Sequence, residues 1–159
     1  MQTEILCVYP SPVGLMRLRF DGGRLIGVDF DDAPPAVPPF PPLPEGDHRR
    51  WLDAYFNGDD PGPLPAHELG GSAFQQRVWL EMLSIPRGQT RSYGEVARRI
   101  GNAPRAVGQA CKRNRLPVFV PCHRIVAADG LGGYAGARGG HKLDRKILLL
   151  RHEGALDTP

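Results

Sequence analysis

Prolines divide this sequence more sharply than any other feature. Seven of the twelve residues from 33 to 44 are proline. Proline fits neither a helix interior nor a central strand, because its ring fixes φ and its nitrogen carries no hydrogen. We therefore expect an extended linker in this segment. A second polar connection with prolines runs from 59 to 71, and we place a domain boundary inside it. The sequence thus predicts an N-terminal domain over 1–69, linker included, and a C-terminal domain over 70–159.

The N-terminal segment is predicted to form a small antiparallel sheet and one helix. Asp21-Gly22-Gly23 is a hairpin signal. Residues 47–56 place aromatic side chains at helical spacing and lead into Asn57-Gly58, which suits a helix end. Three runs have the composition or alternation of strands: 3–9, 15–20 and 25–30.

Helical periodicity replaces strand alternation beyond residue 70. Ser72 is a favourable N-cap for a helix with an apolar stripe, which should end at 86–88. A last amphipathic helix is expected over 143–152. The apolar run 118–120 resembles a strand, and we expect it to present the residues that follow it at the rim of the fold.

Two short helices with a tight turn between them are expected in the middle of this segment. Ser92-Tyr93-Gly94-Glu95 has the sequence of a capping box and opens a helix that stops at Gly101. Pro104 suits the first turn of the next helix, over 105–113. That second helix is basic and rich in small residues, as in a helix-turn-helix that approaches DNA closely, although many short basic helices share this composition.

Charge is distributed unevenly along the chain. Residues 1–69 hold five Lys or Arg against eleven Asp or Glu, whereas 70–159 hold fifteen against six. Net charges of −6 and +9 suggest a polyanion partner for the second half, most simply nucleic acid. A solvated basic surface is the alternative that charge alone leaves open.

Composition limits the compartment and the class of protein. Hydrophobic residues make up 41% and charged residues 23%, which is typical of a globular protein. No apolar run reaches the roughly 20 residues of a membrane span, and the first residues lack the pattern of a signal peptide. Three cysteines without framework spacing indicate reduced thiols, so we expect a cytoplasmic protein with no membrane partner.

Pro121-Cys122-His123-Arg124-Ile125 places a thiol beside an imidazole. A thiol is nucleophilic as thiolate, and a neighbouring base is a common way to form one near neutral pH. A lone cysteine can equally be a small buried hydrophobe. The glycine-rich stretch 130–140 would let backbone approach a ligand closely or form a surface loop, and it lacks the pattern of a nucleotide-binding loop.

From about residue 71 to 154 the chain resembles the O6-alkylguanine-DNA alkyltransferases, also called methylated-DNA–protein-cysteine S-methyltransferases. Six motifs stand in the family's order: Ser92-Tyr93, Arg105-Ala106-Val107-Gly108, Asn114, Pro121-Cys122-His123-Arg124-Ile125, Gly133-Tyr134-Ala135-Gly136 and Leu149-Leu150-Arg151-His152-Glu153-Gly154. The N-terminal half resembles the family in layout only. The resemblance implies an α+β fold, with a small N-terminal antiparallel sheet and helix (a ribonuclease H-like layout) linked to a mainly helical, winged helix-turn-helix-type domain.

The resemblance also implies an activity. Members of this family repair DNA by moving an alkyl group from O6-alkylguanine to a cysteine, in a single turnover and after flipping the base. It implies a monomer that binds double-stranded DNA through the minor groove and needs no cofactor. Activity on O4-alkylthymine, the alkyl size limit and cooperative assembly on DNA stay open. A DNA-recognition or regulatory module without chemistry is the main alternative, and a cysteine hydrolase is disfavoured because its Cys and His are normally distant in sequence.

Roles for single residues follow from the same resemblance. Cys122 would be the nucleophile, His123 its base through a bridging water, and Glu153 the group that orients His123. Asn114 would hold the active-site loop, Tyr93 would donate its hydroxyl to the flipped base, and Arg105 would fill the gap in the base stack. The remaining positions would contact DNA (Ala106, Gly108, Lys112, Arg113) or line the substrate pocket (Tyr134, Ala135, Gly136).

Some positions depart from the family pattern. Arg115 stands where the family usually has proline, and the chain is two residues shorter than some relatives before Arg105, which loosens the register of that arginine. Residues 138–142 look like an insertion, and Cys111 lies on the predicted recognition helix without an assigned role. With Cys7 the only cysteine near the N-terminus, we expect no structural zinc there.

Overall fold

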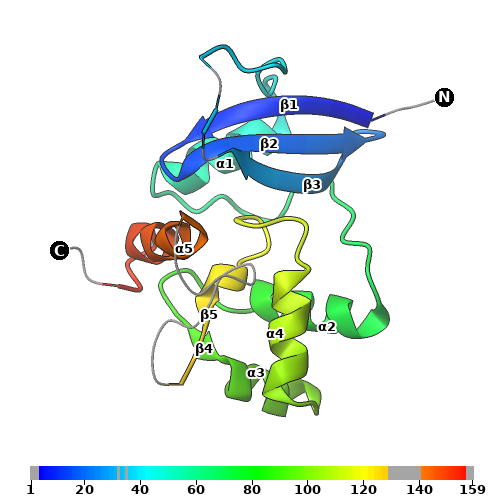
Figure 1. Cartoon of the computed structure of the whole chain (residues 1–159), viewed down its shortest axis with the longest axis vertical. Coiled ribbons are helices and arrows are strands. Elements are labelled where there is room, and N and C mark those ends of the chain that lie inside the picture. The colour runs from blue at the N-terminus through cyan, green and yellow to red at the C-terminus, as the bar shows by residue number, and fades with distance from the viewer. Residues whose placement is uncertain (1–3, 32, 35, 129–140, 157–159) are drawn as a thin grey trace. The chain divides into compact units, whose positions relative to one another are not determined.

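The computed structural model describes residues 4–31, 33–34, 36–128 and 141–156. Backbone contacts group the chain into two compact units, Met1–Leu69 and Gly70–Pro159. Strands dominate the first unit and helices the second (Figure 1). The predicted α+β class is therefore confirmed.

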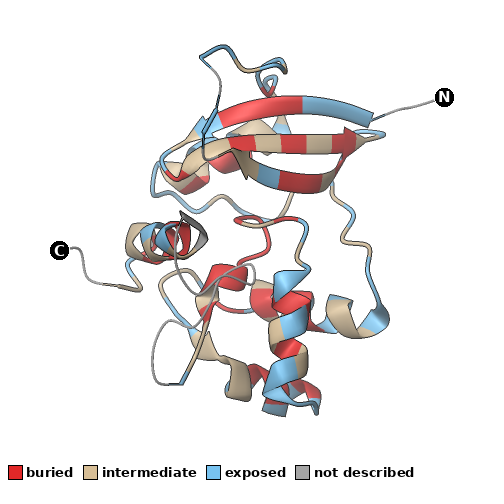
Figure 2. Ribbon diagram, viewed as in Figure 1, coloured by how far each residue is buried: buried red, intermediate tan, exposed pale blue. Residues whose placement is uncertain are grey.

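The first unit contains a three-stranded antiparallel meander and a helix. The strands β1 (Glu4–Ser11), β2 (Gly14–Asp21) and β3 (Arg24–Asp31) pair in sequence order, and the helix α1 spans Asp47–Phe56. Apolar side chains alternate along β2, so every second residue is buried (Figure 2). The residues that α1 buries are Trp51, Leu52 and Tyr55. The predicted hairpin turn is confirmed, because Gly22 and Gly23 both adopt positive φ.

The two proline-containing connections cover the edges of this sheet. Val8 donates to the carbonyl of Pro41 and accepts from the amide of Leu43, which pairs the first connection with β1. Leu25 of β3 makes the equivalent pair of bonds with Ala66 and Glu68. Both edge strands thus have backbone partners, which protects them from pairing with another chain. The proline-rich segment was expected to be an extended linker, and its end forms an isolated bridge with β1.

Four helices form most of the second unit. They are α2 (Ala73–Leu83), α3 (Tyr93–Ile100), α4 (Pro104–Lys112) and α5 (His141–His152). Capping boxes at Ser72 and Ser92 fix the starts of α2 and α3, and Gly101 ends α3 in the left-handed region. A 3-10 helix, η1 (Cys122–Arg124), leads into β5 (Ile125–Val126), which pairs in parallel with β4 (Arg91–Ser92).

The predicted strand at 118–120 is wrong. These three residues form a tight turn in which Val118 has a φ of 76°, and all three side chains are buried. A short apolar run carries no periodicity, so a buried turn and a buried strand have the same composition. Here the run fills the interior before η1.

Candidate active site

Cys122 begins η1 and is almost buried. Its side chain is 6% exposed, and its amide donates to the carbonyl of Val120 at 2.8 Å. The expectation of a thiol at the rim of the fold is therefore wrong. The residues of the turn at 118–120, Pro121 and Cys122 are all buried.

His123 and Glu153 meet in the interior of this unit. The His123 Nε2 lies 2.6 Å from the Glu153 Oε2, and both side chains are fully buried. Arg124 binds the same carboxylate from η1, with Nε 2.8 Å from Oε1 and Nη2 3.0 Å from Oε2. Its Nη1 donates to the carbonyl of Ile85 at 2.7 Å. The structure thus brings the imidazole of His123, the carboxylate of Glu153 and the guanidinium of Arg124 together. His123 directly follows Cys122 in the sequence.

Electrostatics set the protonation state of Glu153 and His123. Burial by itself raises the pKa of Glu153, but the hydrogen bonds and charges of His123 and Arg124 outweigh it and hold that pKa well below its usual range. Burial lowers the pKa of His123, and the contact with Glu153 opposes this shift without reversing it. A carboxylate only accepts hydrogen bonds, so the neutral imidazole carries its hydrogen on Nε2. The Nδ1 of His123 makes no hydrogen bond to any described residue, which leaves it as the basic nitrogen.

Asn114 connects the end of α4 to the turn before Cys122. Its Nδ2 donates to the carbonyl of Val120 at 2.9 Å, and its Oδ1 accepts from the amide of Leu116 at 3.0 Å. These two bonds span the turn that contains Val118, whose left-handed backbone is unfavourable for a β-branched residue. Asn114 therefore holds the backbone immediately before the thiol.

A buried lysine in this region was missed by the sequence reasoning. Lys146 of α5 is 0% exposed, and its Nζ donates to the carbonyl of Ile125 at 2.8 Å. Burial lowers the pKa of Lys146 to about 8, while the charges of Cys122 and Cys111 oppose that shift. A usable signal existed, since residues 146, 149, 150 and 153 share one helix face with the buried Leu149 and Leu150. Arg124 was also given no role.

Cys111 is the second thiol near this lysine. It lies on α4 and is 8% exposed. Burial raises the pKa of Cys111 strongly, the charge of Cys122 adds to that effect, and Lys146 opposes it.

The residues predicted to contact DNA lie on α4 and at its C-cap, Arg113. Arg105, Lys112 and Arg113 are exposed, whereas Ala106 and Gly108 are partly covered. A Cβ on Gly108 would meet no atom within 4 Å, so the helix surface is open there. Tyr93 opens α3, and the pairing of Ser92 with Val126 ties that helix start to the strand after η1. Tyr134, Ala135 and Gly136 lie outside the described residues, as do residues 138–140 of the expected insertion.

Arg115 contributes to a hollow on the second unit. This cavity of about 290 Å³ is lined by Gln75, Trp79, Arg113 and Arg115. An arginine at 115 thus adds a cation beside the end of α4, where the family usually has proline.

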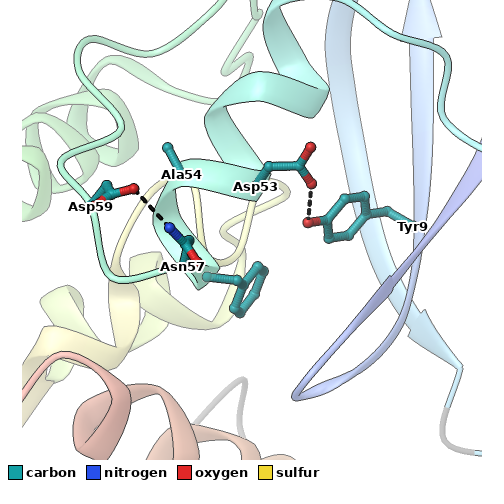
Figure 3. A pocket seen from close by; sticks show the side chains of 6 residues that line it. Tyr9, Asp53, Ala54, Asn57 and Asp59 are labelled. Atoms are coloured by element: carbon teal, nitrogen blue, oxygen red, sulfur yellow. Dashed lines mark hydrogen bonds between the residues drawn. The ribbon is translucent and has the colours of Figure 1, made fainter.

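A larger hollow, of about 440 Å³, lies in the first unit (Figure 3). The Tyr9 hydroxyl donates to Asp53 at 2.7 Å, and the Asn57 amide donates to Asp59 at 2.9 Å. Its polar groups bond to one another, and its two carboxylates disfavour a nucleic-acid phosphate. We therefore assign no chemistry to it.

Among the described residues, no group of three or more His, Cys, Asp or Glu side chains is placed to hold a metal ion. Within the same residues, no helix has the length and apolar character to cross a membrane.

Comparisons with known proteins agree on one family. Residues 73–155 match the family model described as 6-O-methylguanine DNA methyltransferase, DNA binding domain. The methylated-DNA–protein-cysteine methyltransferase of Mycobacterium leprae is 41% identical over 150 residues, which cover 90% of this chain and 88% of the relative.

Solved structures give the same result. The crystal structure of the Mycobacterium tuberculosis O6-methylguanine methyltransferase superposes with a TM-score of 0.78 at 34% identity, covering 96% of this chain and 93% of that one. The structure of Mycobacterium tuberculosis OGT in complex with DNA matches with a TM-score of 0.75 at 35% identity, covering 94% and 92%.

Proposed function

Because this chain belongs to the 6-O-methylguanine DNA methyltransferase family, we propose that it repairs duplex DNA by moving the alkyl group of an O6-alkylguanine onto Cys122. The observation that carries this assignment is the buried His123–Glu153 contact of 2.6 Å, which leaves the His123 Nδ1 basic and without a hydrogen bond to any described residue. That nitrogen belongs to the residue directly after the thiol.

The chemistry follows from these groups. The Cys122 thiol gives its proton to the His123 Nδ1 through a bridging water, and Glu153 stabilises the resulting imidazolium. The thiolate attacks the alkyl carbon in line, so an S–C bond forms as the C–O6 bond breaks. The electron pair of the broken bond leaves on guanine, where the Tyr93 hydroxyl donates a hydrogen bond to the developing charge. The product is a thioether, which has no easy reversal, so each molecule reacts once.

DNA recognition is assigned to α4. The O6 substituent of a stacked base is outside the in-line reach of a buried thiol, so the nucleotide must be extruded. Arg105, exposed at the start of α4, takes the place of the base from the minor-groove side, and the small Ala106 and Gly108 allow close approach. Lys112 and Arg113 neutralise phosphates, which makes binding salt-dependent. The pocket roles of Tyr134, Ala135 and Gly136 complete the proposal, with the protein acting as a cytoplasmic monomer.

Mass spectrometry tests the reaction directly. After incubation with a duplex that carries one O6-methylguanine, we expect one added methyl group, located on Cys122 by peptide mapping. Cys122→Ser should bind the same duplex and remain unmodified. A duplex with O4-methylthymine measures the second substrate in the same assay. An unmodified wild-type protein that still binds damaged DNA would overturn the transfer and favour the non-catalytic recognition module.

A further inference from the structure

The proposed reaction gives no role to the buried Lys146. Lys146 lies on α5 with its side chain 0% exposed, although long charged side chains are almost never fully buried unless paired. Its Nζ is fixed by the carbonyl of Ile125 at 2.8 Å. Ile125 comes directly after η1, which Cys122 begins. The hydrogen bond therefore ties the ammonium to the segment that presents the nucleophile.

Thiols are the groups whose charge acts on this lysine. Burial lowers the pKa of Lys146 to about 8, a negative charge on Cys122 or Cys111 would oppose that shift, and the ammonium predominates at neutral pH. A cation close to a thiol favours thiolate, and it does so more strongly away from water. The two thiols respond differently, because burial raises the pKa of Cys111 strongly and keeps that thiol protonated at neutral pH.

The other ionisable groups around Lys146 and Cys122 come from three parts of the chain. Cys111 belongs to α4, His123 and Arg124 belong to η1, and Glu153 directly follows α5. Arg124 and His123 both bind Glu153, so the negative charge of that carboxylate is already shared. Lys146 also disfavours the protonated form of His123 by charge repulsion. The positive charge of Lys146 thus favours the thiolate form of Cys122 and the neutral form of His123. Both forms are the ones that the proposed transfer requires.

We propose that Lys146 is a positioning residue for alkyl transfer, whose buried ammonium stabilises the Cys122 thiolate. It rests on the proposed role of Cys122 as nucleophile. Lys146 takes no proton from the thiol; His123 still accepts that proton through water. Lys146 affects the equilibrium fraction of Cys122 that is thiolate at a given pH, and His123 affects the rate at which the thiol loses its proton.

The first test measures Cys122 alone, without DNA. Iodoacetamide alkylation of Cys122 is followed by peptide mass spectrometry from pH 5 to pH 10 in the wild type and in Lys146→Met, which keeps most of the length of the side chain but not its charge. We expect Lys146→Met to react about tenfold or more slowly at pH 7, corresponding to one unit of pKa, and to approach the wild-type rate at high pH. Lys146→Arg should retain more of the neutral-pH rate. A loss by the same factor at every pH would overturn the proposal and leave Lys146 as a structural anchor for Ile125.

A second measurement uses the wild type and does not depend on a variant that folds. NMR of ¹³C-labelled lysine follows the titration of Lys146 before and after Cys122 is capped with iodoacetamide. Capping removes the thiolate, so the pKa of Lys146 should fall, and an unchanged titration would contradict the proposal. Neither test uses damaged DNA. Failure of transfer from O6-methylguanine together with a shifted thiol profile would overturn the proposed function and leave only the effect of Lys146 on the Cys122 thiolate.

Discussion

At the scale of single residues, Glu153 is shared by two neighbours with different tasks. Arg124 supplies the positive charge through two hydrogen bonds, and His123 supplies one neutral N–H. Because the guanidinium already balances the carboxylate, His123 is not forced to become imidazolium and remains a base. A planar guanidinium suits this role better than a lysine, since it binds both carboxylate oxygens at once.

The shared carboxylate predicts a pH dependence of folding stability. The pKa of His123 is lowered in the folded protein. As pH falls through 6.5, the ordinary value, this histidine is therefore protonated in the unfolded chain before it is protonated in the folded one, and folding stability decreases. Glu153 also has a lowered pKa, so its contribution is complete above 4.5 and is lost as pH falls below that value. Both effects make the unfolded state bind more protons, and each unit of pKa difference is worth about 1.4 kcal/mol. Urea unfolding at pH 7, 5.5 and 4 should give successively lower free energies.

Glu153→Gln provides the matched comparison. This variant starts less stable at pH 7 and should lose less stability than the wild type between pH 5.5 and 4, because it lacks the carboxylate that titrates. Parallel curves for the two proteins over that interval would show that Glu153 is not held ionised by its partners.

At the scale of elements, the turn between α4 and η1 decides where the thiol lies. Its backbone is unusual at Val118 and is held at both ends by the side chain of one residue, Asn114. Such a conformation persists only where surrounding contacts impose it. The position of Cys122 is therefore fixed before any substrate arrives.

Asn114 can be tested by two substitutions that differ by one hydrogen bond. Asn114→Ala leaves the carbonyl of Val120 and the amide of Leu116 without this partner, and should destabilise the protein by about 1–3 kcal/mol. Asn114→Asp keeps the acceptor for Leu116 and loses the donor to Val120, so both its stability and its iodoacetamide rate at Cys122 should lie between alanine and wild type. An aspartate variant as unstable as the alanine variant would show that the bond to Leu116 contributes nothing.

Sequence patterns predicted elements where a local rule applies. Ser72, Ser92 and Gly101 carry their own capping chemistry, so the start of α2 and both limits of α3 were predicted closely, whereas α2 ends at Leu83, before the expected 86–88. For the candidate site, sequence motifs identified Cys122, His123 and Glu153, and the roles of these residues remain predictions. What sequence could not supply is tertiary. The bonds of Lys146 to Ile125 and of Arg124 to Glu153 join residues 21 and 29 positions apart in the chain.

At the scale of the whole molecule, charge and structure divide at the same place. The unit Met1–Leu69 carries the net negative half, and the unit Gly70–Pro159 carries the positive half. We propose that these two units are the domains 1–69 and 70–159. An acidic first domain leaves the affinity for DNA to the second, and in particular to the exposed cations of α4.

The proposed role of Arg105 predicts a difference between two substrates. Arg105→Ala should slow transfer from duplex O6-methylguanine by roughly tenfold or more, the equivalent of about 1.4 kcal/mol, and leave transfer from free O6-benzylguanine nearly unchanged, since a free base needs no flipping. Arg24→Ala removes the same charge from an exposed site on β3 and should affect neither. Equal losses on both substrates for Arg105→Ala would refute its role in extruding the base.

The two tryptophans of this chain give each unit its own optical reporter. Trp51 in the first unit is 7% exposed and donates to the carbonyl of Gly62. Trp79 in the second is 1% exposed and donates to the carbonyl of Ala110, which links α2 to α4. Fluorescence of Trp51→Phe therefore follows the second unit alone, and fluorescence of Trp79→Phe follows the first. Each protein would report, without any added dye, whether alkylation of Cys122 is sensed only by the unit that carries it.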